Sequence, residues 1–385
     1  MSLLSSIVCP ECGGNFEPHV PQTICEKCSS PLLCRYDLER VREEVDREML
    51  AQRGRGLWRW AELLPVGNPS HRYSLGEGDT PMLETPNLAE RLGLDMLYLK
   101  DESSNPSGSF KARGMAVAVS RAIELGLSEF VLPTAGNAGG ALAVYAVRAG
   151  ATAHIFMPDD APDVHRMEIE ATGIKIEFVD GLLDFAGQAA AEAGKKHGWF
   201  NMATFKEPYR VEGKKIMGYE LLEDFGWEYP DVILYPTGGG TGLVGMWKAF
   251  DEIEALGWVS GERPRMITVQ AEGCAPVVQA LRDGAERVTP WEGAVTSAQG
   301  LRVPSVFADR IILRAVRESN GVGVSVSEQD IYQAQKDLAV HEGILACLEG
   351  AATLAGLKRL LASGQIDPSE RILLFNTGTG LKNLS

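Results

Sequence analysis

From about residue 96 to the end of the chain, short apolar runs alternate with stretches of helical periodicity. The apolar runs predict buried strands at 96–100, 129–133, 152–157, 174–179, 231–235, 266–271, 310–313 and 371–375. Apolar residues three or four apart predict helices at 111–126, 138–149, 163–172, 184–197, 210–225, 242–256, 275–283, 328–340 and 350–363. This alternation predicts an α/β fold in which crossover units build mainly parallel sheets with helices on both faces.

Two Cys-x-x-Cys pairs mark the first 36 residues as a separate segment. Cys9 and Cys12 form one pair, and Cys25 and Cys28 form the other. Two such pairs place four thiolates on two tight turns, which is the ligand set of a closed, structural zinc site. A redox dithiol is the alternative, but redox pairs come singly within a βαβ pattern. The segment therefore predicts a zinc ribbon whose metal supplies its folding energy, with Cys34 as an unassigned fifth thiol.

A charged helix is expected over Asp37–Gln52, followed by an irregular connector. Its tryptophans, Trp58 and Trp60, are expected to pack against the main body of the protein.

Composition limits the function classes that remain. A chain of 385 residues is long enough for two or three domains, and 42 glycines suit an α/β protein with many tight turns. The formal charge of -15 argues against a general nucleic-acid or membrane-surface binder. No apolar run approaches the roughly 20 residues of a membrane span, and no signal peptide is evident. We therefore expect a cytoplasmic protein that binds neither nucleic acid nor membrane.

A polar turn at residues 103–110 leads from a predicted strand into the helix expected at 111–126. Asn-Pro and Ser-Gly dipeptides form the turn, and Ser109 is expected to cap the helix. Lys111 then lies in the first helical turn, where the helix dipole disfavours a cation and lowers the lysine pKa. That environment suits an amine nucleophile toward a carbonyl. The alternative is an ordinary exposed lysine at a helix start.

Three further glycine-rich loops follow predicted strands, where open parallel sheets bind ligands. Residues 133–140 place Asn137 among small residues that allow close approach to a flat ligand, although Gly139 and Gly140 also suit tight helix packing. Residues 236–243 lack the Walker lysine and the G-x-G-x-x-G spacing, so consecutive backbone N–H groups there fit a monophosphate. Residues 376–382 end the last strand in hydroxyl and glycine residues, which a purely structural turn also explains.

These four loops, in this order, resemble the pyridoxal-phosphate enzymes of the tryptophan-synthase-β fold type, and most closely the threonine synthase family. The similarity covers residues 71–385, and its most specific motif is Lys-Asp-Glu-x-x-Asn-Pro-Ser-Gly-Ser-Phe-Lys. It implies two doubly wound, mainly parallel α/β domains with the cofactor between them (fold type II). The expected bounds are a ribbon at 1–36, a large cofactor-binding domain at 37–105 and 210–385, and a small lysine-bearing domain at 106–209.

The resemblance also implies the cofactor contacts. Lys111 forms the Schiff base with pyridoxal phosphate, Asn137 contacts the phenolic oxygen, and Thr377 hydrogen-bonds the pyridine nitrogen. Phe110 beside the lysine belongs to the same set. The phosphate loop consists of Gly238, Gly239, Gly240, Thr241 and Gly242.

A further resemblance concerns the substrate. The run Glu-Pro-Tyr-Arg-Val-Glu-Gly-Lys at 207–214 is similar to the threonine-synthase segment Asn-Pro-Tyr-Arg-x-Glu-Gly-Gln. Arg210 then clamps a substrate phosphate with Lys214 as a second cation, while Ser109 and Thr134 complete the expected substrate site. The alternative is that Arg210 pairs with a neighbouring glutamate on a solvated helix start.

The implied reaction is γ-elimination of phosphate from O-phospho-L-homoserine and addition of water at Cβ, with Lys111 as the general base at Cα. Ala112, however, stands where threonine synthases usually carry Asp. This leaves open an ammonia-lyase acting on threonine, serine or another hydroxy-amino acid, and a cysteate-synthase-like β-replacement enzyme. A non-catalytic or nucleic-acid-associated module is opposed by the acidic charge and by the four loops. The family also implies a homodimer that acts on a small amino-acid substrate.

Overall fold

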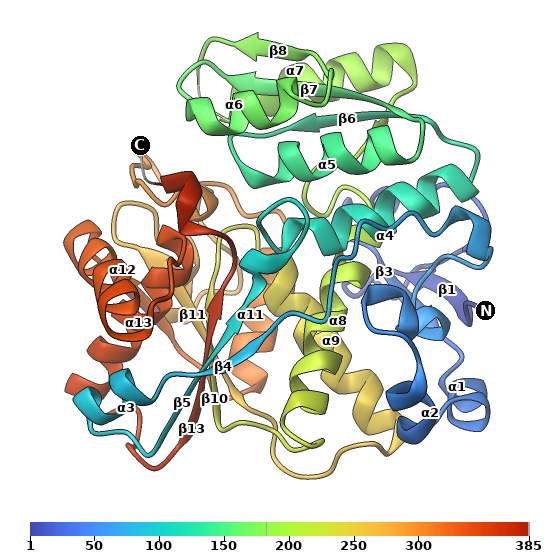
Figure 1. Ribbon diagram of the computed structural model, residues 1–385. Helices are drawn as coiled ribbons and strands as arrows, with labels where there is room; N and C mark the ends of the chain where they lie inside the picture. Colours follow the sequence, from blue (N-terminus) through green and yellow to red (C-terminus); the bar gives the residue numbers. More distant parts are fainter. Residues whose placement is uncertain (182, 384–385) are drawn as a thin grey trace. The chain divides into compact units, whose positions relative to one another are not determined.

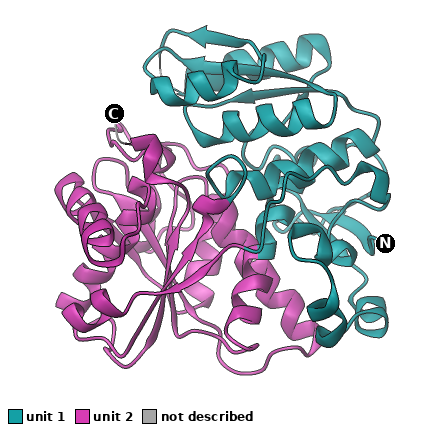
Figure 2. Ribbon diagram, in the orientation of Figure 1, with its two compact units in different colours: residues 1–79, 105–216 teal, residues 80–104, 217–385 magenta. Residues whose placement is uncertain are grey.

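The structure is a computed structural model that describes residues 1–181 and 183–383 (Figure 1). The chain divides into two compact units (Figure 2). Unit 1 contains residues 1–79 and 105–216, and unit 2 contains residues 80–104 and 217–385. The division into a ribbon, a large domain and a small domain stays a prediction, because compact units report packing and not independent folding.

Unit 1 begins with a three-stranded antiparallel sheet in the order β2-β1-β3. Its strands are β1 (Leu4–Val8), β2 (Asn15–Phe16) and β3 (Leu33–Tyr36). Ile7, at the middle of the sheet, pairs with Phe16 on one side and Cys34 on the other. The predicted ribbon segment is therefore a small sheet that carries the two cysteine pairs on its loops.

The single helix predicted over residues 37–52 is wrong, because two short helices occupy this segment: α1 (Leu38–Glu44) and α2 (Arg47–Gln52). Val45 between them is extended, and the Asp46 side chain accepts a hydrogen bond from the Met49 N–H and so caps a new helix. The connector forms two 3₁₀ turns, η1 (Leu57–Leu63) and η2 (Pro69–His71). Trp60 in η1 is fully buried, as expected, whereas Trp58 is only partly buried.

The second sheet of unit 1 is wholly parallel, in the order β8-β7-β6-β9. The strands are β6 (Glu129–Pro133), β7 (Thr152–Pro158), β8 (Ile176–Val179) and β9 (Phe200–Asn201). The helices of this unit are α4 (Lys111–Glu124), α5 (Asn137–Arg148), α6 (Asp163–Glu170), α7 (Leu183–His197) and the first half of α8 (Tyr209–Asp224). Ala186 and Ala190 of α7 pack on Val131 and Phe156, so this helix covers β6 and β7.

Helices α4 and α8 of unit 1 approach each other through glycine. A Cβ atom added to Gly213 would lie 2.0 Å from the Arg113 carbonyl oxygen, and one added to Gly114 would lie 2.8 Å from the Arg210 carbonyl oxygen. Because neither position has room for a side chain, the two backbones are in direct contact.

Unit 2 contains a six-stranded sheet in the order β12-β11-β10-β13-β5-β4, in which only the β4–β5 pair is antiparallel. Its strands are β4 (Met82–Glu84), β5 (Met96–Asp101), β10 (Val232–Pro236), β11 (Arg265–Ala271), β12 (Gly323–Val326) and β13 (Arg371–Asn376). Its helices are α3 (Pro86–Leu92), the second half of α8, α9 (Thr241–Leu256), α10 (Pro276–Arg282), α11 (Asp309–Glu318), α12 (Glu328–Glu342) and α13 (Leu348–Ala362). Short 3₁₀ turns are η3 (Glu102–Ser104), η4 (Gln299–Leu301) and η5 (Gly380–Asn383).

The strand predicted at 310–313 is wrong, because these residues lie in helix α11. Ile311, Ile312, Ala315 and Val316 are buried while Arg314 is exposed, which is the helical period of three to four. A three-residue apolar run does not distinguish the two periods. The edge position of the sheet belongs to β12, which the sequence pattern missed together with β4, α3 and β9.

Among the described residues, no helix combines the length and the apolar character needed to cross a membrane.

The close approach of α4 and α8 gives a first prediction. We expect Gly213→Ala to destabilise the protein by roughly 3 kcal/mol, because the added methyl group must push a backbone carbonyl aside. Gly187→Ala in α7 is the matched control: nothing lies within 4 Å of its added Cβ, so the gain in helix propensity should stabilise by up to about 1 kcal/mol. Thermal unfolding midpoints test both. Equal effects of the two variants would contradict the direct backbone contact.

Candidate functional site

The turn before helix α4 positions Lys111 in unit 1. Gly108 adopts a left-handed conformation (φ +63°) and its N–H donates to the Asn105 carbonyl at 2.7 Å. The Asn105 side chain in turn accepts a hydrogen bond from the Gly78 N–H at 3.2 Å. Lys111 is the first residue of the 14-residue helix, as the sequence predicts, and its side chain is half-buried.

Ser109 is not the helix cap that the sequence predicts. The N-cap residue of α4 is Phe110, which makes no side-chain cap hydrogen bond, and Ser109 contributes only its carbonyl oxygen, to the Ala112 N–H. The Ser109 hydroxyl is buried and has no hydrogen-bond partner among the described residues. Because buried hydroxyls are nearly always paired, this one is available to a ligand.

The loop from β6 to α5 carries Thr134 and Asn137. Asn137 opens helix α5, and the Thr134 hydroxyl is tied to the Gly136 backbone, which fixes the loop. A Cβ atom on Gly139 would lie 2.6 Å from Thr134 Cγ2, and one on Gly140 would lie 2.2 Å from the Glu168 side chain. Both glycines therefore have the packing role that the sequence left open, and this role is compatible with ligand binding by Asn137.

Arg210 and Lys214 lie one turn apart on α8, and both are fully buried. The solvated helix start that was the alternative for Arg210 is therefore wrong. The Arg210 guanidinium donates to the Met202 carbonyl at 2.6 Å, and its Nε atom has no hydrogen-bond partner among the described residues. Lys214 Nζ lies 5.4 Å from the centroid of the Phe110 ring, and Lys111 Nζ lies 4.2 Å from the same centroid. Unit 1 thus gathers two lysines at one aromatic ring, with Arg210 one helical turn from the second.

Glu207 is a site residue that the sequence analysis left without a role. Its Oε2 atom accepts hydrogen bonds from the N–H groups of Tyr209 and Arg210 at 2.6 and 3.0 Å, so it caps α8. Burial raises its pKa to about 7, against the opposing effect of the Arg210 and Lys214 cations. Glu207 Oε1 has no hydrogen-bond partner in the described part of the chain. The Glu-Pro pair just before a helical run was the available sequence signal.

In unit 2, the loop from β10 to α9 consists of backbone with almost no room for side chains. A Cβ atom added to Gly238 would lie 2.1 Å from the Gly300 carbonyl, and one added to Gly242 would lie 1.8 Å from the Tyr235 hydroxyl. Gly240, the N-cap of the 16-residue helix α9, has φ +75° and requires glycine. The N-terminus of a helix presents N–H groups that can bind an anion, so the geometry of Gly238–Gly242 is compatible with an anion site.

Thr377 follows β13, the direct neighbour of β10. Carboxyl ends of parallel strands share one sheet edge, so the structure brings Thr377 and the glycine loop to the same edge of unit 2. The buried Thr377 hydroxyl lies 3.6 Å from the thiol of Cys347, the N-cap of α13. Burial raises the pKa of Cys347 above its ordinary value, so this contact is made by a neutral thiol. No sequence pattern points to it, because the two residues are far apart in the chain and are brought together by tertiary contacts, such as the hydrogen bond from the Cys347 N–H to the Gly378 carbonyl.

The four ribbon cysteines converge. The Sγ atoms of Cys9, Cys12, Cys25 and Cys28 all lie within 4.8 Å of one another, with Cys9–Cys28 at 3.4 Å and Cys12–Cys25 at 3.5 Å. Zinc–sulfur bonds of about 2.3 Å in a tetrahedron require sulfur separations of about 3.8 Å, so the cluster has the size of a zinc site. Cys34 lies outside it, with Sγ 4.0 Å from the Pro208 carbonyl oxygen.

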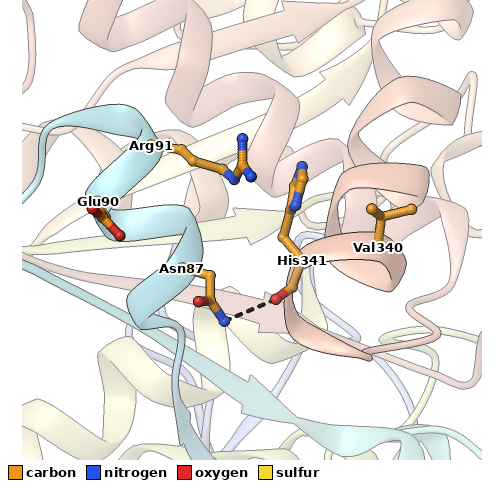
Figure 3. A pocket seen from close by; sticks show the side chains of 5 residues that line it. All are labelled: Asn87, Glu90, Arg91, Val340 and His341. Carbon is orange, nitrogen blue, oxygen red and sulfur yellow. Dashed lines mark hydrogen bonds between the residues drawn. The ribbon is translucent and has the colours of Figure 1, made fainter.

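A surface pocket of about 600 Å³ lies elsewhere, between α3 and α12 of unit 2 (Figure 3). Asn87, Glu90, Arg91, Val340 and His341 line it. The Asn87 amide donates to the His341 carbonyl at 2.9 Å. None of the predicted site residues lines this pocket.

Comparison with known proteins identifies the family. The sequence pattern of the family described as "Pyridoxal-phosphate dependent enzyme" matches residues 73–378. The chain belongs to this family. Its cofactor is therefore pyridoxal phosphate.

The relatives cover nearly the whole chain. The sequence is 35% identical to a threonine synthase of Methanocaldococcus jannaschii, over 97% of this chain and 92% of that protein. It is 34% identical to a threonine synthase of Methanosarcina acetivorans, over 97% of this chain and 91% of the relative. The processed form of threonine deaminase isoform 2 from Solanum lycopersicum has the same fold, with a TM-score of 0.69, 22% identity and coverage of 87% and 85%. The expected fold type II is thereby confirmed.

The cysteine cluster predicts metal dependence of the ribbon. We expect the purified protein to hold about one zinc ion per chain, and Cys12→Ser to lose it on dialysis with a lower unfolding midpoint, because the site loses one of four thiolates. Glu26→Ala, an exposed change between Cys25 and Cys28, should keep the metal. Zinc per chain by elemental analysis decides: full occupancy in Cys12→Ser would contradict the four-thiolate site.

Glu207 predicts a pH dependence of stability. Its pKa is about 7 in the folded chain against an ordinary value of 4.5, so between these values the folded state holds a proton that the unfolded state has released. The free energy of unfolding therefore falls as pH rises from about 4.5 to about 7. We expect Glu207→Gln to lose this component. The difference in unfolding free energy between wild type and variant should therefore change between about pH 4.5 and about pH 7. A constant difference across this range would refute the raised pKa.

Proposed function

We propose that the chain is a threonine synthase, which converts O-phospho-L-homoserine and water to L-threonine and phosphate. The observation that carries the proposal is the burial of Arg210 and Lys214 in unit 1, with Lys214 facing the ring that Lys111 also faces. A phosphorylated amino acid needs such cations beside its reacting carbons, because a buried phosphate requires compensating charge. The two relatives that match nearly the whole chain, both named threonine synthase, support this choice.

The cofactor is held, in this proposal, by residues from four loops. Lys111 would hold the cofactor through its aldehyde group, Asn137 would hold the ring oxygen beside that group, and Phe110 would pack next to the lysine. The N–H groups of Gly238–Gly242, with Thr241 among them, would hold the phosphate, and Thr377 would hold the ring nitrogen. The glycine-rich loop at the start of α9 supports the assignment of Gly238–Gly242 to the cofactor phosphate, because Gly238, Gly240 and Gly242 have no room for side chains. When bound, the cofactor supplies an electron sink for the carbon atoms that lose protons.

The remaining steps belong to the side chains of this chain. Lys111 removes the proton from substrate Cα, which its place in the first turn of α4 favours by disfavouring its charged form. Loss of a proton from Cβ then expels phosphate from Cγ. Arg210 and Lys214 bind this phosphate and stabilise its departure, before water adds at Cβ. Glu207 fixes the first turn of α8, and Ser109 and Thr134 orient the substrate. The Ser109 hydroxyl and Arg210 Nε, which have no hydrogen-bond partner within residues 1–181 and 183–383, are the atoms that a bound substrate would satisfy.

The four-cysteine cluster, we further propose, binds zinc as a structural ion, because four thiolates leave no open position for catalysis.

A second candidate is an ammonia-lyase acting on a hydroxy-amino acid. It is favoured by Ala112, which is fully buried directly after Lys111, where threonine synthases usually carry Asp. In that case the cations of α8 would have no substrate phosphate to bind.

The two functions differ in product. We expect the protein to release inorganic phosphate from O-phospho-L-homoserine, and to form little 2-oxoacid from threonine. We expect Lys111→Ala to lose this turnover and the visible absorbance of the bound cofactor, because the variant has no amine for the cofactor aldehyde. Lys175→Ala, at an exposed position in unit 1, is the control and should keep both.

The opposite result, 2-oxoacid without phosphate release, would favour the ammonia-lyase. Retention of absorbance and turnover in Lys111→Ala would overturn the role of this lysine.

A further inference from the structure

The last strand of the ribbon contacts the first turns of helix α8. The Tyr36 hydroxyl donates a hydrogen bond to Glu212 Oε2 at 2.9 Å, and Cys34 Sγ lies 4.0 Å from the carbonyl oxygen of Pro208. Both side chains come from β3 and both are buried. The ribbon is therefore packed onto the helix that presents Arg210.

Lys215 joins a third segment to this contact. Its Nζ atom lies 2.8 Å from Glu212 Oε2, donates to the Leu63 carbonyl at 2.7 Å and lies 4.0 Å from the centroid of the Tyr36 ring. Glu212 and Lys215 are both fully buried. A buried ion pair holds its geometry tightly, because loss of any partner leaves a charge without compensation. The ribbon, the connector η1 and α8 thus share one ion pair, which we call the ribbon latch: Tyr36, Glu212 and Lys215.

The latch and the two cations occupy opposite faces of α8. At about 100° per residue, Arg210 and Lys214 lie on one face of the helix, and Glu212 and Lys215 lie on the other. The cation face is the one turned to α4, because a Cβ atom on Gly114 would meet Lys214 Nζ. Contacts on the latch face therefore set the rotation of α8 about its own axis. This rotation in turn sets the direction in which the Arg210 and Lys214 side chains point.

Helix α4 is tied to the ribbon as well. The Arg121 guanidinium donates to the carbonyl oxygen of Pro18, which lies between the two cysteine pairs. The ribbon thus holds both the helix that begins at Lys111 and the helix that begins beside Arg210.

We propose that Tyr36 is a positioning residue for the substrate phosphate, which acts through Glu212 and Lys215 on the direction of Arg210 and Lys214. This rests on the proposed function, in which these cations bind the phosphate. The zinc ribbon then has a defined role, because it fixes β3, and β3 fixes the anion-binding turns of α8.

The test removes one hydroxyl group. Tyr36→Phe keeps the ring against Lys215 and removes the hydrogen bond to Glu212. We expect KM for O-phospho-L-homoserine and the inhibition constant of inorganic phosphate to rise about five- to tenfold. This is less than the full effect of one lost hydrogen bond to a charged group, because Tyr36 acts on the phosphate only through Glu212 and Lys215. We expect kcat within about twofold of wild type, because Lys111 is untouched. Tyr229→Phe removes an equivalent tyrosine–glutamate hydrogen bond in unit 2 and should change neither constant.

Three further readouts separate positioning from general damage. Zinc per chain, cofactor absorbance and the inhibition constant of L-threonine, which carries no phosphate, should be unchanged in Tyr36→Phe. Glu212→Gln replaces the ion pair with Lys215 by a neutral hydrogen-bond acceptor and should give the same pattern. It is the second test of the latch if the first variant does not fold. An unchanged KM and phosphate constant, or equal losses for phosphate and threonine, would overturn the proposal.

The proposed function can fail separately. If the wild-type protein does not turn over O-phospho-L-homoserine, the function is wrong, and binding of inorganic phosphate, followed through the cofactor absorbance, still tests the latch. If the wild type turns over the substrate and Tyr36→Phe is identical to it, the latch alone is wrong.

Discussion

The glycine contact between α4 and α8 is the constraint on which the chemistry of unit 1 depends. With a carbonyl oxygen 2.0 Å from where a Gly213 side chain would begin, the two helices touch through their backbones. This proximity brings the first turn of α4, with Lys111, beside the first turns of α8, with Arg210 and Lys214. Bulkier residues at the crossing would separate the Lys111 amine from the two cations of α8, which the proposed function assigns to the same substrate.

Burial of Arg210 and Lys214 removes their charges from water, and the surrounding contacts offset this unfavourable free energy of desolvation. Arg210 donates to a carbonyl and lies beside the capping Glu207, while the opposite face of α8 carries the ion pair of Glu212 and Lys215. Charges buried in this way persist only where partners hold them or where a ligand completes them. The ribbon packs against the far face of this helix, through the hydrogen bond that Tyr36 donates to Glu212.

Many of the helices, strands and loops could be predicted from the sequence, and the wrong predictions have identifiable physical causes. Strands such as 129–133 and the glycine loop at 236–243 were predicted because buried parallel strands and their loops have strong local signatures. The apolar run at 310–313 was wrongly predicted as a strand, because it is too short to distinguish helical from strand periodicity. Serine is a common helix-capping residue, but Ser109 does not make the capping hydrogen bond. Asp46 caps a second helix within a charged segment that the sequence pattern predicted as one helix.

The sequence by itself determined local features: which lysine opens a helix after a polar turn, which glycines form the loop before α9, and which four cysteines share two turns. Tertiary structure alone decided the environment of each group. The burial of Arg210 and Lys214, the pKa of Glu207 and the thiol of Cys347 beside Thr377 depend on contacts between segments far apart in the chain. Burial and charge partners are properties of packing, and no local pattern of residues encodes them.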